Sequence, residues 1–148
     1  MGRTKRQLRN GEVTLGGWLM IGHPSVAQRH NEEVVVVVML EHVDAVRNAD
    51  AILATPGIDA ALIGPYDLSA SMGLAGQMRH PDVLAAQQTI LNACRKARVP
   101  AGIHVVAVDP AAVRGRMDQG FRFVACGIDT EFILAGCRAV MAGVRANA

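Results

Sequence analysis

Five consecutive valines lie at residues 34–38, inside an apolar run that continues to Leu40. Branching at Cβ restricts the side-chain torsion and favours extended backbone, so the run predicts a β-strand. A membrane-spanning helix needs about 20 apolar residues, and this run is much shorter. Its apolar residues do not alternate with polar ones, which is typical of a strand covered on both faces. The run therefore predicts a buried strand of a parallel sheet.

Strand-like and helix-like segments alternate along the rest of the chain. Strands are predicted over residues 15–21, 34–40, 60–63, 101–106 and 121–126, and helices over residues 4–9, 43–54, 82–96, 110–119 and 129–144. The helix over 82–96 places Val83, Ala86, Ile90 and Ala93 on one face. This order predicts an α/β fold of parallel βα units with right-handed crossovers. Five strands fit either an open sheet or an incomplete (β/α)8 barrel, which has eight strands.

Composition sets the broad class of the protein. The 148 residues are 51% hydrophobic and 19% charged, which predicts one folded domain over residues 1–148. Fifteen basic and thirteen acidic residues give no reason to expect a nucleic-acid partner. Neither a signal peptide nor a membrane span is recognisable, so we expect a soluble, cytoplasmic protein. Cys94, Cys126 and Cys137 show no metal-binding or disulfide spacing and are predicted to be buried thiols.

Two acidic residues follow neighbouring predicted strands. Glu41 ends the strand over 34–40, and Asp67 follows the strand over 60–63, about one βα repeat later. Parallel βα folds bind ligands at the carboxyl ends of their strands, so the two carboxylates are expected to lie close together. Two carboxylates suit a hard divalent cation such as Mg²⁺ or Mn²⁺. Spacing alone favours the alternative of two acids that only complement the dipoles of the helices they precede.

The residues around this pair resemble a known enzyme family. The segment IGPYDLS at residues 63–69, with Met72-Gly73 after it, is similar to the IGPxDLS segment of the HpcH/HpaI aldolases. The resemblance continues through His80-Pro81, residues 101–103 and GFRFVACGIDT at residues 120–130. LGGWL at residues 15–19 is similar to the first strand of that family. The IGPYDLS block is the most specific of these, and the resemblance covers most of the chain.

The resemblance implies a (β/α)8 barrel and a metal-dependent pyruvate-type aldolase acting on 4-hydroxy-2-oxo acids. Glu41 and Asp67 match the acidic ligands of a divalent metal, Mg²⁺ or Mn²⁺ with Co²⁺ as a further candidate. The backbone around Pro65, Tyr66 and Asp67, together with Trp18, matches the binding site of a pyruvate-like 2-oxo acid. Cleavage in the family gives an aldehyde and a pyruvate enolate after a base removes the proton of the distal hydroxyl group.

The same alignment lacks the second to fourth βα units of the family. The first strand is followed directly by the fifth, with the join near residues 25–30. The family's proton-transferring His and substrate-binding Arg have no counterpart, so no catalytic residue is carried over and impaired activity is expected. His23 is the best-placed substitute base. His42 is expected to point away from the ion by strand alternation, and His104 to pack within the sheet.

The strands that remain, equivalent to the first and the fifth to eighth, would form one arc with two open edges. Open strand edges and an uncovered inner face favour association, so a homo-oligomer is expected. A non-catalytic remnant, acting through metal or oxo-acid binding or subunit association, is the alternative to the aldolase. A third alternative is an unrelated five-stranded ligand-binding module, although no phosphate-loop motif supports it.

Overall fold

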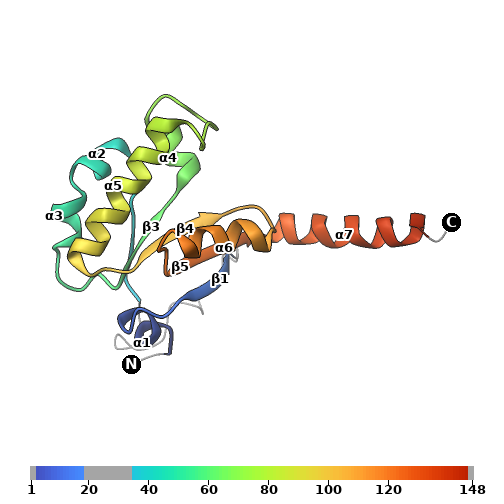
Figure 1. Ribbon diagram of the computed structural model, residues 1–148, viewed down its shortest axis with the longest axis horizontal. Helices are drawn as coiled ribbons and strands as arrows, with labels where there is room; N and C mark the ends of the chain where they lie inside the picture. The colour runs from blue at the N-terminus through green and yellow to red at the C-terminus, as the bar shows by residue number, and fades with distance from the viewer. Residues whose placement is uncertain (1–2, 19–34, 147–148) are drawn as a thin grey trace, which may run out of the picture.

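The protein, described here from a computed structural model over residues 3–18 and 35–146, is built on a parallel β-sheet (Figure 1). Its strands are β1 (Thr14–Trp18), β2 (Val37–Met39), β3 (Ala60–Ile63), β4 (Ala101–Val105) and β5 (Phe123–Ile128). They lie in the order β1-β5-β4-β3-β2. Every pair of neighbouring strands is parallel. The expected α/β class is thereby confirmed, and so is the expected arc in which the first strand lies beside the last.

Seven helices accompany the strands within these residues. They are α1 (Arg3–Arg9), α2 (Val43–Arg47), α3 (Ala49–Leu53), α4 (Pro65–Ser71), α5 (Pro81–Ala97), α6 (Pro110–Asp118) and α7 (Asp129–Ala146). Helix α5 packs against β3 and β4, and α6 packs against β4 and β5. Helices α2 and α3 lie against α5 on its far side from α6 (Figure 1). None of the helices described here is long and apolar enough to cross a membrane.

The main core lies between the sheet and α5. Ile63 and Ile103 of the sheet are fully buried there, with Ile90 of α5. The predicted apolar face of α5 is confirmed, because Val83, Ala86, Ile90 and Ala93 are all at most 8% exposed. Every residue of β3 is buried, including those on the two opposite faces of the strand. A central strand of a parallel sheet is expected to be covered in this way.

The valine run forms a shorter and more exposed strand than its sequence predicts. Strand β2 contains only three residues and is the outer strand of the described sheet next to β3. Val36 and Met39 are each 45% exposed, so the expectation of a fully buried strand is wrong for this part of the run. Residue 34 lies outside the described residues. An outer strand has one neighbour instead of two, and its side chains lose the cover that a central position gives.

Three local predictions also need correction. The helix expected over 43–54 is interrupted at Asn48, whose side-chain amide donates a hydrogen bond to the carbonyl oxygen of Asp44 at 2.8 Å. Helix α4 was not among the predicted helices, although Pro65 occupies its first turn, where proline fits. Only Cys94 is a buried thiol, because Cys126 is half-buried and Cys137 exposed.

Helix α1 is fixed at the amino ends of the strands by Asp59, whose side chain is 3% exposed. Lys5 Nζ lies 2.9 Å from one carboxylate oxygen of Asp59, and Arg9 Nη2 lies 3.3 Å from the other. The backbone N–H of Val36 donates to the same carboxylate at 3.0 Å. Asp59 thus joins α1, the start of β3 and the segment that leads into β2.

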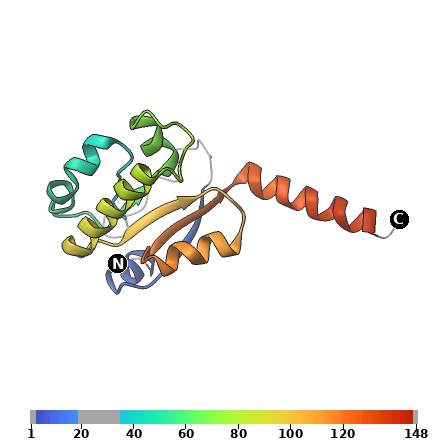
Figure 2. The ribbon, with the colours of Figure 1, turned by 45° about the horizontal axis from the view of Figure 1, so that its top comes forward.

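Helix α7 extends away from the rest of the molecule in both ribbon views (Figures 1 and 2). None of its residues is buried. Its exposed side chains include Ile133, Val140 and Val144, each more than 60% exposed. The helix therefore presents apolar surface that the described chain leaves uncovered.

Candidate metal centre

The two predicted acids lie together at the carboxyl ends of neighbouring strands. Strands β2 and β3 are paired with Met39 beside Leu62, and the N–H of Leu40 donates to the carbonyl oxygen of Leu62 at 2.9 Å. Glu41 follows directly in the segment after β2. Asp67 lies in the first turn of α4, which begins two residues after β3 ends. The structure therefore confirms that the two acids lie at the same end of the sheet, as predicted.

Both carboxylates converge on Gly64, the residue that precedes α4. A Cβ atom placed on Gly64 would lie 2.6 Å from Glu41 Oε2 and 3.4 Å from Asp67 Oδ2. Atoms do not approach as closely as the first distance, so any side chain at this position would displace the Glu41 carboxylate. The missing Cβ of Gly64 thus leaves the space in which the two acids come together.

The environment of Glu41 disfavours its charge. Partial burial raises the pKa of the Glu41 carboxyl, and the neighbouring negative charge of Asp67 raises it further. Within the described part of the chain, neither Glu41 nor Asp67 has a basic partner at salt-bridge distance. Two close carboxylates without a neutralising partner repel each other, and a bound cation would relieve this repulsion.

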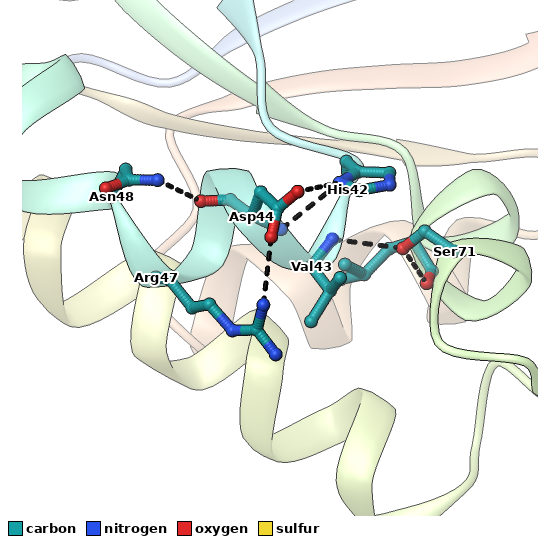
Figure 3. Close-up of polar contacts among 7 residues, drawn as sticks. His42, Val43, Asp44, Arg47, Asn48 and Ser71 are labelled. Carbon is teal, nitrogen blue, oxygen red and sulfur yellow. Dashed lines mark hydrogen bonds and ion pairs between the residues drawn. The ribbon is translucent and has the colours of Figure 1, made fainter.

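A hydroxyl group holds the two acid-bearing segments in register (Figure 3). Ser71, at the end of α4, accepts a hydrogen bond from the backbone N–H of Val43 at 3.1 Å. The same hydroxyl donates to the carbonyl oxygen of Leu68 at 2.8 Å. Because Val43 lies two residues after Glu41, this contact fixes the start of α2 against the helix that carries Asp67.

A second serine shapes the other side of α4. Ser69 is fully buried, and its hydroxyl donates to the carbonyl oxygen of Tyr66 at 2.6 Å and accepts from the N–H of Gly76 at 3.2 Å. Pro65 is buried, whereas the Tyr66 side chain is 57% exposed. The segment expected to bind the oxo acid is therefore anchored by the serine and the proline, while its tyrosine faces solvent.

The histidines have different surroundings from one another. His42 caps α2: its Nδ1 accepts from the N–H of Asp44 at 3.2 Å, so the ring is engaged by the helix that follows it. His104 lies in β4, half-buried, with Nε2 3.2 Å from the carbonyl oxygen of Gly127, as expected for a residue packed in the sheet. His23 lies outside the described residues, and so does the join near residues 25–30. The backbone of Trp18 ends β1, and its side chain is not described.

The donor set fits a hard cation with few protein ligands. The described residues contain no cluster of three or more His, Cys, Asp or Glu side chains that could hold a metal ion, so Glu41 and Asp67 stand as a pair. Mg²⁺ is commonly bound through one or two carboxylates and keeps several waters or substrate oxygens. Glu41 directly precedes His42, the cap of α2, so its position also fits the alternative in which the two acids complement helix dipoles. Asp67 does lie in the first turn of α4, where its charge also suits the helix dipole.

Three residues of the site were not assigned roles from the sequence. Gly64 and Ser69 belong to the IGPYDLS segment, where the glycine could have indicated a close approach between chain segments. Ser71 follows that segment, and its role depends on the packing of α4 against α2. Such a contact across distant parts of the sequence leaves no local signal.

Comparison with known proteins places this geometry in a family. The sequence profile described as HpcH/HpaI aldolase/citrate lyase matches residues 5–135. A hydroxypyruvate/pyruvate aldolase of Paraburkholderia phytofirmans is 37% identical over 135 residues, which cover 91% of this chain and 50% of the relative. A 4-hydroxy-2-oxo-heptane-1,7-dioate aldolase of Salmonella paratyphi C is 39% identical over 126 residues, covering 84% of this chain and 47% of the relative.

Solved structures agree with the sequence relatives. The crystal structure of an HpcH/HpaI aldolase/citrate lyase family protein from Burkholderia cenocepacia superposes with a TM-score of 0.73 at 30% identity. The match covers 95% of this chain and 60% of that protein. The chain thus spans about half the length of the curated relatives it matches.

Proposed function

The chain belongs to the HpcH/HpaI aldolase/citrate lyase family, and from this premise we propose that Glu41 and Asp67 hold a divalent cation to which a 2-oxo acid binds. Mg²⁺ and Mn²⁺ are the first candidates, with Co²⁺ as a third. The reaction class is that of a pyruvate-enolate aldolase acting on 4-hydroxy-2-oxo acids. The relatives named as aldolases for hydroxypyruvate or pyruvate, and for 4-hydroxy-2-oxo-heptane-1,7-dioate, support this substrate class.

One observation carries the proposal: the convergence of two carboxylates on the open space at Gly64. Burial and the charge of Asp67 raise the pKa of Glu41, so the pair is electrostatically unfavourable without a cation. A bound divalent ion would supply Lewis-acid stabilisation of an enolate oxygen. The protein itself would orient the two carboxylates. The hydrogen bond of Ser71 between α2 and α4 supports this role.

The backbone at the start of α4 is the proposed binding site for the substrate carboxylate. The first N–H groups of a helix have no intrahelical acceptor, and Gly64 offers no side chain to cap them. The N–H groups of Tyr66 and Asp67 are therefore suitable donors to an anionic group beside the cation. Trp18 would contribute from the end of β1, as the resemblance of the first strand implies.

We expect carbon–carbon cleavage by this chain to be weak or absent. The His and Arg that the family uses for proton transfer and for the keto oxygen have no counterpart in the aligned sequence. Positioned acid–base catalysis contributes about 10²–10⁴ in rate, so its loss alone would be severe. These absences favour the second candidate function, a non-catalytic domain that binds metal and oxo acid. We propose further that residues 1–148 form one domain without the family's second to fourth βα units and that it associates into a homo-oligomer.

Exchange of the methyl protons of pyruvate in D₂O, followed by NMR, separates these functions. An enolate-forming site exchanges the protons only with Mg²⁺ present. The exchange is expected to persist in Asp44→Asn, an exposed acid near the site, and to be lost in Asp67→Asn. Metal binding without exchange would support the binding-only function. A folded wild-type protein with neither metal binding nor exchange would contradict both.

A further inference from the structure

A basic cavity lies at the amino ends of the strands. Its volume is about 200 Å³, and its walls come from α1, the end of α5 and the segments that lead into β4 and β5. Among the described residues that line it, none is acidic and four are arginines, namely Arg9, Arg95, Arg98 and Arg122. The acid pair follows the carboxyl ends of parallel strands, so this cavity lies at the other end of the sheet. It is therefore separate from the candidate metal centre.

Three of these arginines carry charges that no acid compensates. Within the described part of the chain, Arg95, Arg98 and Arg122 form no ion pair. Arg9 is paired with Asp59, but it shares that carboxylate with a lysine of the same helix. Like charges around one cavity repel each other, and an anion bound between them would relieve the repulsion.

Backbone carbonyl groups hold two of the guanidinium groups in place. Arg122 Nη1 donates to the carbonyl oxygens of Met117 and Phe121, both at 3.1 Å. Arg95 Nη2 donates to the carbonyl oxygen of Gln119 at 2.8 Å. These acceptors are neutral, so they orient the guanidinium groups without compensating their charge. Side chains that are already oriented lose less freedom when they bind a ligand.

Two backbone positions are adapted to these arginines. Gly120 has φ +105°, and a Cβ atom there would lie 2.7 Å from Arg95 Nη2, so the glycine leaves space for the guanidinium. Arg98 ends α5 with φ 57° and ψ 31°, and it is the only residue of the described chain, glycines aside, with a positive φ. Glycine is the usual residue in this conformation at a helix end. An arginine there carries a conformational cost, which indicates a role for its side chain.

We propose that this cavity binds a small compound that bears a diphosphate group. The planar fork of a guanidinium matches phosphate oxygens, and each such hydrogen bond is strengthened by charge. A diphosphate carries several negative charges, which suits the three uncompensated guanidinium groups, whereas a single carboxylate would leave most of their charge in place. The bound group would join the end of α5 to the segment before β5. The inference does not depend on the proposed metal centre.

Titration calorimetry with pyrophosphate, in metal-free buffer at constant ionic strength, tests the site directly. Wild type is expected to bind pyrophosphate, and Arg122→Met to bind it about tenfold more weakly or worse, because a charge-assisted hydrogen bond is lost. Arg114→Met is the matched control, since it removes the same charge at an exposed position that does not line the cavity. Asp67→Ala is expected to bind like wild type, which separates this site from the metal centre. Circular dichroism establishes that each variant is folded.

Arg98→Gly distinguishes ligand binding from a purely structural role. Glycine adopts a positive φ without penalty, so without phosphate this variant is expected to unfold at an unchanged or higher denaturant concentration. Its affinity for pyrophosphate should nevertheless fall about tenfold. An arginine that only complements the dipole at the carboxyl end of α5 would give a lower midpoint and unchanged binding. The proposal would be overturned if wild type did not bind pyrophosphate, if Arg98→Gly bound it equally well, or if Arg114→Met lost as much affinity.

Discussion

Gly64 determines how closely the acids of the candidate metal centre can approach each other. Its backbone angles, φ −95° and ψ 94°, lie close to the extended region and suit residues with a side chain. The restriction at this position is therefore the space that a Cβ atom would take from Glu41 Oε2, 2.6 Å away. Because the displaced atom belongs to the end of a flexible side chain, a substitution here should harm the site more than the fold.

The Gly64→Ala variant is expected to remain folded and to bind Mn²⁺ about 10–100-fold more weakly than wild type, as measured by calorimetry. The added methyl group moves the Glu41 carboxylate out of place. Gly115→Ala serves as the control, because a Cβ atom at Gly115 of α6 meets no atom within 4 Å. Unchanged affinity in Gly64→Ala would show that Glu41 is not a ligand in its present position.

Glu41 also makes stability depend on pH. The pKa of its carboxyl is raised in the folded protein, so the charged form costs stability once pH rises through that pKa. In EDTA at pH 7, Glu41→Gln is therefore expected to resist denaturant better than wild type. The difference should vanish below about pH 4, where the wild-type side chain is also neutral. A wild type more stable than the variant at pH 7 would contradict the repulsion inferred between Glu41 and Asp67.

At the residue scale, the meeting of Glu41 and Asp67 could be predicted because each follows a strand and parallel strands end at one edge. Gly64, Ser69 and Ser71 could not be assigned roles in the same way. Their roles rest on distances between segments that only the packed structure fixes. That His42 points away from the ion stays a prediction; the structure shows that its ring caps α2, a role that strand alternation does not indicate.

At the scale of elements, Asp59 joins α1 to the sheet through its ion pairs with Lys5 and Arg9. Burial by itself raises its pKa, but the Val36 N–H, Lys5 and Arg9 outweigh this, and the pKa of Asp59 is lowered. A lowered pKa contributes stability above the ordinary value, which is lost as pH falls through the folded pKa. The docking of α1 should therefore weaken in acid.

Asp59→Asn is expected to lower the free energy of unfolding at pH 7 by about 3–5 kcal/mol, because it removes one charge of the largely buried ion pair between Asp59 and Lys5. Urea unfolding followed by circular dichroism measures the effect. The difference from wild type should shrink below about pH 4, as the wild-type Asp59 becomes protonated. Asp50→Asn provides a control, since its pair with Lys96 is exposed. An equal effect of both substitutions would show that Asp59 does not fix α1.

Elements with a strong repeating pattern were predicted well, whereas local interruptions and the exposure of an outer strand were not. The helix α5 and its buried face follow from apolar spacing alone. The interruption at Asn48 is a local departure from helical backbone angles, φ −103° and ψ 11°, and helix periodicity does not report it. The partial exposure of β2 follows from its outer place in the sheet, whereas its valines favour only the strand conformation.

At the scale of the whole molecule, several apolar side chains are exposed and are not covered by the described chain. Strands β1 and β2 are the outer strands of the described sheet, and α7 carries exposed apolar side chains along its length. Sequence alone predicted the arc of strands and its open edges. It did not predict that α7 would leave the sheet uncovered, because its apolar pattern is equally typical of a helix that packs on its own strands.

The protein is expected to form an oligomer in light scattering at micromolar concentration. Replacing Ile133 and Val140 of α7 with Lys should shift the population towards the monomer, because these residues are 66% and 67% exposed and would be buried on association. Met78→Lys, at an exposed position outside α7, is the control. A monomeric wild type under these conditions would refute the association.

The central claim is that Glu41 and Asp67 form a divalent-metal site that accepts a 2-oxo acid. Calorimetric titration of Mn²⁺, with and without oxalate as a stand-in for the oxo acid, tests it on wild type, Asp67→Ala and the control Asp44→Ala. Binding by wild type and the control, strengthened by oxalate and abolished in Asp67→Ala, is the predicted result. A folded wild type that binds no Mn²⁺, or an Asp67→Ala variant that binds it equally well, would contradict the claim.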